Sequence, residues 1–472
     1  MVAVRRLAVG LVVLGTACSS SSPHQNELHP GGGGGNSGAG GSIGTGGASA
    51  CPDIFAPTLQ TYAIDVGAAD WAAIQSEFLT AGALVDQAFV AYQPVEYPVV
   101  FHYGGETADA TIRLRGDSSW REAAAIDGAN GKMQLSIAFD SANPDASFHG
   151  IGKIKLDMPR TDPTFMRERI ANNWLRSVGI AAGCTTSAQL MVNGNVYGVF
   201  VAEEHFGHRV LSVFFPGNAD GDLFDGGWTP QTNKLNPDTK RLAMFWDATT
   251  PAALSAIVDV PQSVTSWAAE ALLNDADGYW GGDHNFYLYD QGAKGYVFIP
   301  HDLDSTLDYL GRFDSDPITW WSVRPEWMLP IPQQYLMVMG DDTLRAMYIE
   351  ALRAELARFD VTSLQAAIDA SADQIRAAVA ADPHRPTDMT MQDFEDAVKL
   401  ARDGIKERAD YVTRWLMCKD SHVNDDGDGD GYSWCNDCRD DDPSVHPGAA
   451  EICGNGFDDN CNGVVDDGCA AP

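Results

Sequence analysis

The stretch GYVFIPHDLDSTL, residues 295–307, places an apolar run directly before two acids. Residues 296–299 predict a short buried strand that ends at Pro300. Asp302 and Asp304 follow, and the alternation of an extended chain puts both carboxylates on one face, where they can share a metal ion. We therefore expect the end of this strand to hold a divalent cation.

Further polar residues precede the strand in an informative order. Asp275 and Asp277 come first, and Asn285 follows them. A protein kinase presents its catalytic base, its second metal ligand and its principal metal ligand in the same order. For the base we choose Asp277, with Asp275 and Asp283 as alternatives that the order leaves open. The order also makes Asn285 a ligand that joins the acid pair at the metal.

The pattern elsewhere predicts an α+β fold whose C-terminal part is helical. Strands are expected at 99–103 and 111–114, and a hairpin over 189–202 turns at Asn193-Gly194. Apolar residues recur at helical spacing in residues 165–178 and, after Asp341, in three blocks near 343–358, 363–380 and 391–416.

The balance of charge restricts the partners. The 472 residues include 31 Lys plus Arg and 65 Asp plus Glu, a formal net charge of −34. So acidic a chain repels nucleic acid and anionic lipid, which argues against both as main partners and favours cations. With 44% hydrophobic residues the chain can bury a substantial core.

The first 50 residues have the pattern of an export signal and a tether. Two arginines precede an apolar run over 7–15 that is too short to span a bilayer, and Thr16-Ala17-Cys18 follows it. Because this pattern resembles a bacterial lipobox, we expect residues 1–18 to be a lipoprotein signal peptide that leaves Cys18 lipidated; an ordinary signal peptide is the alternative. Residues 19–50, rich in Gly and Ser, predict a flexible linker. We therefore expect an exported chain, anchored by lipid at the bacterial cell envelope, on the outer membrane or cell surface.

The cysteines support export. Without Cys18 eight remain, six of them within the last 55 residues, and an even clustered set in an exported chain predicts disulfides. Cys435 and Cys438 form a CxxC pair that could instead bind zinc or act in redox chemistry.

Residues 418–472 carry 14 of the acids and predict a module of their own. Within it, D-x-D-x-D-G has the spacing of an EF-hand-type calcium loop, in which position seven gives a backbone carbonyl and position twelve closes the loop. The expected ligands are Asp426, Asp428, Asp430, Tyr432 and Asp437. A second, incomplete loop has the same kind of ligand spacing, with Asp458, Asn460, Asn462 and Asp466. Because Asp437 is shorter than the usual Glu, we expect a weak site suited to extracellular calcium.

Five ordered segments resemble the blocks of the CotH family, bacterial and fungal surface proteins similar to atypical secreted kinases. They are IRLRGDSSW (112–120), DPTFMRERIANNWL (162–175), NGNVYGVFVAEEHF (193–206), HNFYLYD (284–290) and GYVFIPHDLDSTL (295–307). The resemblance spans roughly residues 55–417 and is assigned to a domain over 51–417. In the tail, DDDPSVHPGAAEICGNGFDDNCNGVVDDG (440–468) resembles a short Asp- and Cys-rich metal-binding motif found at the ends of secreted bacterial proteins.

The CotH resemblance implies an atypical protein-kinase-like fold that binds ATP with Mg²⁺ or Mn²⁺ and phosphorylates Ser or Thr of a surface or secreted protein. It matches Asn285, Asp302 and Asp304 to the metal ligands. Glu204 matches an acid that could pair with a nucleotide-binding lysine, and the arginines that could contact phosphate are Arg115 and Arg167.

Two departures from the family pattern bear on activity. Ala138 stands where the family often has Lys, and His301 stands where Trp is common before the acid pair. The missing cation is left open among Lys132, Lys153 and Lys155. The resulting hypothesis is an exported CotH-like protein kinase with a calcium-binding C-terminal module. The alternative is a non-catalytic surface or adhesion protein that keeps the same fold.

Overall fold

The computed structural model describes most of the chain from Cys51 onward. The described residues are 51–82, 94–116, 118–141, 143, 146–158, 160–282, 284–307, 313, 315–318, 332–421, 426–455 and 457–461. The expected signal peptide with Cys18 and the linker lie outside them, as do Asp283, Asn462 and Asp466. Among the described helices, none is both long and apolar enough to cross a bilayer.

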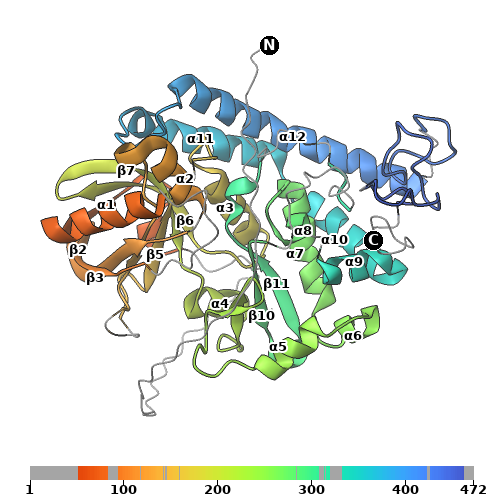
Figure 1. Cartoon of the computed structure of the whole chain (residues 1–472), viewed down its shortest axis with the longest axis horizontal. Helices are drawn as coiled ribbons and strands as arrows, with labels where there is room; N and C mark the ends of the chain where they lie inside the picture. The colour runs from red at the N-terminus through yellow and green to blue at the C-terminus, as the bar shows by residue number, and fades with distance from the viewer. Residues whose placement is uncertain are drawn as a thin grey trace, which may run out of the picture.

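Seven strands form a closed barrel in the order β1-β2-β3-β4-β5-β7-β6 (Figure 1). Neighbouring strands are antiparallel, except that β1 runs parallel to β6 and closes the barrel. Side chains that point inward, such as Ile64, Ile112 and Ile154, are fully buried. The strands are β1 (Gln60–Val66), β2 (Tyr97–Tyr103), β3 (Glu106–Leu114), β4 (Leu135–Ala138), β5 (Lys153–Asp157), β6 (Thr185–Val192) and β7 (Asn195–Glu204).

Two tight turns set the register of the barrel hairpins. Gly104-Gly105 joins β2 to β3, and Asn193-Gly194 joins β6 to β7. All four residues have positive φ, between 48° and 86°, as two-residue hairpin turns of type I′ require. The predicted strands and the predicted Asn-Gly hairpin are confirmed.

Helices α1 (Ala68–Gly82), α2 (Ser118–Asp127) and α3 (Arg167–Ser177) accompany the barrel, with the 3-10 turns η1 (Asp53–Phe55) and η2 (Gly128–Asn130). Helix α3 falls within the predicted helix over 165–178. It contacts both the barrel strand β6 and the 3-10 turn η4 (Leu303–Ser305) that carries Asp304. A disulfide between Cys51 and Cys184 joins the start of the described chain to the barrel.

A second, four-stranded sheet has the order β11-β10-β8-β9. Its strands are β8 (Leu223–Asp225), β9 (Thr229–Pro230), β10 (Phe286–Asp290) and β11 (Tyr296–Pro300), so the predicted strand at 296–299 is confirmed. The surrounding helices and turns are α4 (His208–Phe214), α5 (Thr239–Trp246), α6 (Pro251–Ser255), α7 (Val260–Leu273), α8 (Tyr279–Gly282) and η3 (Gly292–Lys294).

The C-terminal part is helical, as predicted, with α9 (Gln333–Gly340), α10 (Asp342–Leu356), α11 (Val361–Ala380) and α12 (Met391–Ser421). Asp341 and Asp360 cap α10 and α11, accepting hydrogen bonds from the first backbone N–H groups. Helix α12 runs from beside the barrel to the C-terminal module (Figure 1). One continuous apolar core links the barrel, the second sheet and these helices.

The structure confirms part of the expected fold: a mixed α+β chain with a helical C-terminal part and a disulfide-linked C-terminal region. The expected kinase-like arrangement of the strands needs correction. The described strands form a barrel and a separate sheet rather than the two lobes of a typical protein kinase. The reason is that β1 pairs with both β2 and β6, which leaves the first sheet without a free edge.

Candidate functional site

The hairpin of β10 and β11 brings Asn285 and Asp302 to the same end of the second sheet. Phe286 pairs with Pro300 in the ladder, and the His301 N–H donates to the Asn285 carbonyl at 3.0 Å. Asn285 and Asp302 both have left-handed backbones, with φ of 48° and 56°. Asn and Asp tolerate this conformation better than other side chains with a Cβ, and such residues cluster at functional sites. The segment after β11 is therefore not extended: Asp302 is left-handed and Asp304 follows in the 3-10 turn η4, so the extended alternation expected for the two acids is wrong.

The chain after α7 lies alongside the Asp302 segment. The Ala276 N–H donates to the Ser305 carbonyl at 3.3 Å, and the Leu307 N–H donates to the Leu273 carbonyl at 2.9 Å. These bonds place Asp277 beside Asn285, whose amide nitrogen donates to an Asp277 carboxylate oxygen at 3.1 Å. Residues separated by a strand hairpin thus share one site.

The acids of this site act on one another. Burial raises the pKa of Asp304 well above its usual value, and the charges of Asp302 and Asp277 raise it further. Burial also raises the pKa of Asp277, with a further contribution from Asp302. Asp302 makes no capping hydrogen bond to η4 with its side chain. The charge of Asp302 thus acts on both Asp277 and Asp304, while His284 lies 3.8 Å from the Asp277 carboxylate and lowers its pKa. Acids gathered in this way supply the oxygen ligands that a divalent cation needs.

Asp275 and Asp277 differ in solvent exposure. Asp275 is fully buried, and one of its oxygens has no hydrogen-bond partner. Burial and the nearby charge of Glu270 raise the pKa of Asp275 well above its usual value, and burial raises the pKa of Glu270 to about 8. The Asp277 side chain is 46% exposed. Of the two, Asp277 can therefore meet a substrate hydroxyl.

Three predicted candidates for the nucleotide-binding cation occupy different surroundings. Lys155 is buried on β5, and its Nζ lies 2.8 Å from a Glu203 oxygen on the neighbouring strand β7. Lys132 is buried elsewhere, where it pairs with Asp382 and donates to the Val199 carbonyl. Lys153 is half-buried two residues before Lys155 on the same strand face.

Lys155 faces a second group of buried acids. Asp157, Glu168 and Glu203 each offer an oxygen within 4.8 Å of the others. Both Glu168 oxygens and one Asp157 oxygen lack a hydrogen-bond partner. Burial raises the pKa of Glu168 well above its usual value, and the charges of Glu203 and Asp302 add to this effect. The group is therefore close enough to the Asp302 site for their charges to interact.

The structure also shows the partners of the predicted residues Glu204, Arg115 and Arg167. Glu204 forms its ion pair with Arg209, so the acid beside Lys155 is Glu203. Adjacent residues of a strand point to opposite faces, which accounts for the difference. Arg115 pairs with Asp157 and lies beside the Lys155 group. The remaining arginine, Arg167, donates to the Thr161 carbonyl at 3.0 Å and lies 3.7 Å from Asp162.

The structure describes the surroundings of both departures from the family pattern. His301 stacks on Tyr287 with ring centroids 4.0 Å apart, and its Nε2 lies 3.3 Å from an Asp225 oxygen. Ala138 pairs with Lys153 across β4 and β5. An aromatic pair and a cation thus stand close to the positions where the family pattern has Trp and Lys.

Sequence reasoning missed Asp157, Glu168 and Glu203. The alternation in KIKLD, residues 153–157, was a usable signal, because it places Lys155 and Asp157 on the same polar face of a strand. The approach of Glu168 from α3 depends on helix packing, which spacing does not reveal.

The first C-terminal loop has its acids gathered. Asp426, Asp428 and Asp430 each offer an oxygen within 4.8 Å of the others. Asp426 accepts from the Gly429 and Gly431 N–H groups, and Gly431 has a φ of 99° that suits glycine. One oxygen each of Asp428, Asp430 and Asp437 is buried without a hydrogen-bond partner. Burial raises the pKa of Asp437 to about 6, and the charges of Asp430 and Asp428 contribute.

The second predicted loop is described only in part. Asp458 is buried, and Asn460 accepts through its carbonyl from the Gly448 N–H at 3.1 Å. In the first loop Tyr432 is partly exposed and stacks on His446 with ring centroids 5.0 Å apart.

Both cysteines of the CxxC pair form disulfides, which excludes zinc binding by this pair. Cys435 is bonded to Cys418 in the last turn of α12, and Cys438 is bonded to Cys461. The predicted disulfides are confirmed for these residues.

Comparison with known proteins identifies the family. The sequence model of the family described as CotH kinase protein matches residues 112–412. The chain belongs to the CotH kinase protein family. A model described as "Putative metal-binding motif" matches residues 437–467 of this CotH protein.

One relative and one solved structure are similar to this CotH protein. It is 26% identical over 190 residues to Invasin CotH2 of Rhizopus delemar, and the match covers 32% of each chain, about a third of the relative's length. It is also similar to the crystal structure of the Helicobacter pylori proinflammatory kinase CtkA, with 12% identity and a TM-score of 0.33 over 71% of this chain and 94% of that chain. So low a TM-score carries no argument about function.

Proposed function

We propose that the chain is an exported protein kinase that transfers the γ-phosphoryl group of ATP to Ser or Thr of a surface or secreted protein. One observation carries the proposal. The end of the β10–β11 hairpin gathers Asn285, Asp302 and Asp277, and the charge of Asp302 acts on Glu168 in the buried group around Lys155. Phosphoryl transfer needs these parts: oxygen ligands, a phosphate-binding cation and a carboxylate base.

The residues fit a divalent cation. The buried acids Asp304, Glu168 and Asp275 have pKa values raised well above normal, and two of them carry oxygens without hydrogen-bond partners. Such groups are stabilised by a nearby positive charge. Asp302, Asp304 and Asn285 would hold Mg²⁺ or Mn²⁺. When bound, the cation would neutralise charge on the phosphate oxygens.

The chain's own residues supply the remaining functions. Lys155 is positioned by Glu203 at 2.8 Å and would contact phosphate oxygens, with Arg115 beside it. Asp277 would accept the proton of the substrate hydroxyl, since its half-exposed carboxylate is oriented by the Asn285 amide. Lys153 and Arg167 are further candidates for phosphate contact, whereas the Lys132 ammonium is already held by Asp382.

The C-terminal module is proposed to bind Ca²⁺. The support is the set of buried, unpartnered oxygens on Asp428, Asp430 and Asp437, at the third, fifth and twelfth positions of the loop. Asp426 and the Tyr432 carbonyl would complete the ligands. The second loop, with Asp458 and Asn460, remains a weaker candidate.

Export is proposed on chemical grounds. Three disulfides among the described residues suit an oxidising compartment. The lipid anchor at Cys18, at the outer membrane or cell surface, follows from the sequence pattern. A non-catalytic surface protein with the same fold is the alternative. The observation that favours this alternative is the name of the relative, Invasin CotH2.

Incubation with labelled ATP and Mn²⁺ tests the proposed activity. We expect the purified full chain to incorporate phosphate into itself or into an added generic protein substrate, and Asp302→Ala to abolish incorporation. Asp388→Asn changes an exposed acid that is not part of the proposed site. It is the control and should leave incorporation intact. Equal labelling by the wild type and Asp302→Ala would refute the assignment.

A further inference from the structure

We propose that Ca²⁺ in the loop 426–437 strengthens nucleotide binding at the Asp302 site, through contacts that run along the end of α12 and the segment 315–318 to Trp280. This inference rests on the proposed function and adds a regulatory link to it. Every contact in the series is a hydrogen bond, a disulfide or a ring contact between described residues.

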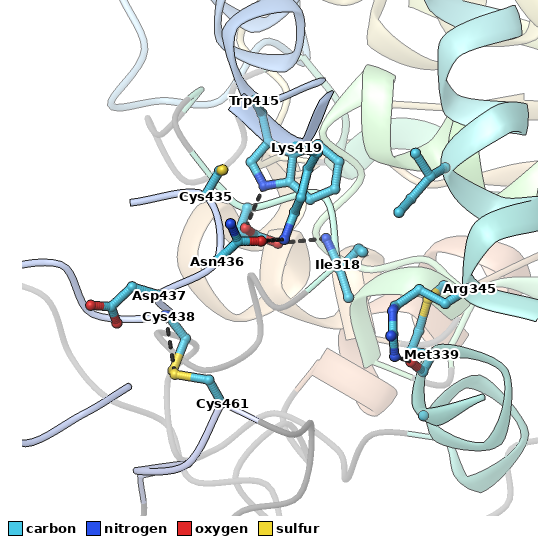
Figure 2. A pocket seen from close by; sticks show the side chains of 13 residues that line it. Ile318, Met339, Arg345, Trp415, Lys419, Cys435, Asn436, Asp437, Cys438 and Cys461 are labelled. Atoms are coloured by element: carbon cyan, nitrogen blue, oxygen red, sulfur yellow. Dashed lines mark hydrogen bonds between the residues drawn. A yellow bond between two sulfur atoms is a disulfide. The ribbon is translucent and has the colours of Figure 1, made fainter. Parts of the chain in front are cut away.

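The series begins at Asp437, which closes the calcium loop. Its backbone lines a cavity of about 470 Å³ together with Trp415, Lys419 and Ile318. Figure 2 shows the Asp437 carboxylate pointing away from these three side chains. One of its oxygens is buried without a hydrogen-bond partner, and the charges of Asp428 and Asp430 act on the carboxylate. Asp437 therefore faces the calcium loop on one side and the helices on the other.

The residues directly before Asp437 are fastened to α12. Cys435 is disulfide-bonded to Cys418, and the Asn436 side-chain oxygen accepts from the Lys419 ammonium at 2.9 Å (Figure 2). The same ammonium lies 4.9 Å from the centre of the Trp415 ring. A change in the position of Asp437 is thus transmitted to the last turns of α12.

Trp415 connects α12 to the segment 315–318. Its ring is fully buried, and its indole N–H donates to an Asp316 carboxylate oxygen at 2.7 Å. The other Asp316 oxygen accepts from the Ile318 N–H at 2.7 Å. Asp316 therefore fixes the shape of this segment and ties it to α12.

The segment in turn holds Trp280. The Pro317 carbonyl accepts from the Trp280 indole N–H at 2.9 Å and also from the Tyr348 hydroxyl. Trp280 belongs to α8, which lies in the chain between Asp277 and Asn285. Its backbone N–H donates to a Glu270 oxygen at 3.2 Å. The contacts end at the short stretch that positions both polar residues of the proposed site.

A cation that fixes Asp437 reduces the freedom of each element in this series. A nucleotide that needs residues 276–282 to be ordered then binds at a smaller entropic cost. Coupling is reciprocal, so nucleotide must tighten calcium binding by the same factor.

The test measures the affinity of the full chain for a non-hydrolysable ATP analogue with Mg²⁺, by calorimetry, with and without about 1 mM Ca²⁺, a concentration suited to weak extracellular sites. We expect calcium to tighten nucleotide binding roughly 5-fold or more, within the usual range of coupling. Hydrogen exchange in residues 276–282 should slow on calcium addition, which is a readout independent of activity.

Two variants locate the coupling. Trp415→Phe removes the indole bond to Asp316 and keeps a ring, so calcium should still bind while its effect on nucleotide affinity falls toward 1-fold. Trp246→Phe is the matched control, because it removes an indole bond to the Gly227 carbonyl at 3.2 Å outside the series. Asp437→Asn should bind nucleotide as the calcium-free wild type does, with or without added calcium.

Several results would overturn the inference. If calcium and nucleotide both bind but independently, the coupling is refuted and the proposed function stands. If Trp415→Phe keeps the full calcium effect, the contact series is refuted. Should Trp415→Phe fail to fold, Asn436→Ala supplies the same test, because it removes the bond from Lys419 without changing a proposed calcium ligand. If no nucleotide binds at all, both the proposed function and the coupling are contradicted.

Discussion

The backbone N–H of His301 donates to the carbonyl of Asn285 at 3.0 Å, as the last bond of the β10–β11 ladder. Directly beyond it the chain turns into the left-handed conformation at Asp302, as it does at Asn285 on the other strand. This bond sets the spacing between Asn285 and Asp302, two of the three residues proposed to hold the metal. A hairpin, rather than a long-range contact, therefore fixes the core of the site.

The two buried lysines, Lys155 and Lys132, should differ in the effect of a change to methionine. Lys155→Met should reduce phosphoryl transfer by roughly 100-fold or more, the size expected when a charge-stabilising donor is removed. Lys132→Met leaves Asp382 buried without its partner and should lower the free energy of unfolding by about 3–5 kcal/mol. Chemical denaturation and labelled-ATP assays below the melting temperature measure both. Normal labelling by Lys155→Met would remove that lysine from the site.

Glu168 should make the cation-free chain pH-sensitive. Its pKa in the folded chain is raised well above normal by burial, whereas the unfolded value is about 4.3. Ionisation therefore disfavours the fold, and stability should fall as the pH rises above about 4. Glu168→Gln should flatten this dependence and raise the melting temperature without divalent cations. Unchanged pH dependence in Glu168→Gln would show that its charge is neutralised by other means.

Calcium binding to the first loop should weaken in mild acid. Burial raises the pKa of Asp437 to about 6 in the cation-free chain, so below pH 6 a proton competes with the cation for this carboxylate. Calcium titrations of the full chain at pH 5, 6 and 7.5 should show affinity falling as the pH drops. Asp437→Asn should weaken binding at every pH, and a pH-independent affinity in the wild type would contradict this assignment.

The disulfide from Cys51 to Cys184 should stabilise the fold more than the Cys438–Cys461 disulfide of the C-terminal module does. It closes a separation of 133 residues, against 23 for the bond from Cys438 to Cys461. Long loops restrict the unfolded chain more, so replacing both Cys51 and Cys184 by Ser should destabilise the fold by about 3–5 kcal/mol. The matched Cys438 and Cys461 double variant should lose less. Equal losses in denaturant titrations would contradict the loop-length explanation.

Local patterns predicted much of this fold. The Asn193-Gly194 turn, the strand before Asp302 and the three C-terminal helices follow from turn chemistry and apolar periodicity, which neighbouring residues determine. The closed barrel was not predictable in this way, because the parallel pairing of β1 with β6 joins residues about 130 positions apart.

In the site, too, the residues joined by local structure were predictable, and those joined by long-range packing were not. Asp302 and Asn285 flank a hairpin, so their order in the sequence already suggests proximity. Glu203 and Glu204 are adjacent and identical in type, and only the pairing of β5 with β7 decides which one meets Lys155. Glu168 reaches the group from a helix whose packing depends on the whole core.

The most direct measurement of the central claim is the anomalous diffraction of Mn²⁺ in crystals of the full chain grown with a non-hydrolysable ATP analogue. We expect a peak about 2.1 Å from carboxylate oxygens of Asp302 and Asp304 and from the Asn285 side-chain oxygen, the spacing of tightly bound small divalent cations, beside the nucleotide phosphates. Manganese bound elsewhere in the chain, with no peak at these three residues in the presence of nucleotide, would contradict it.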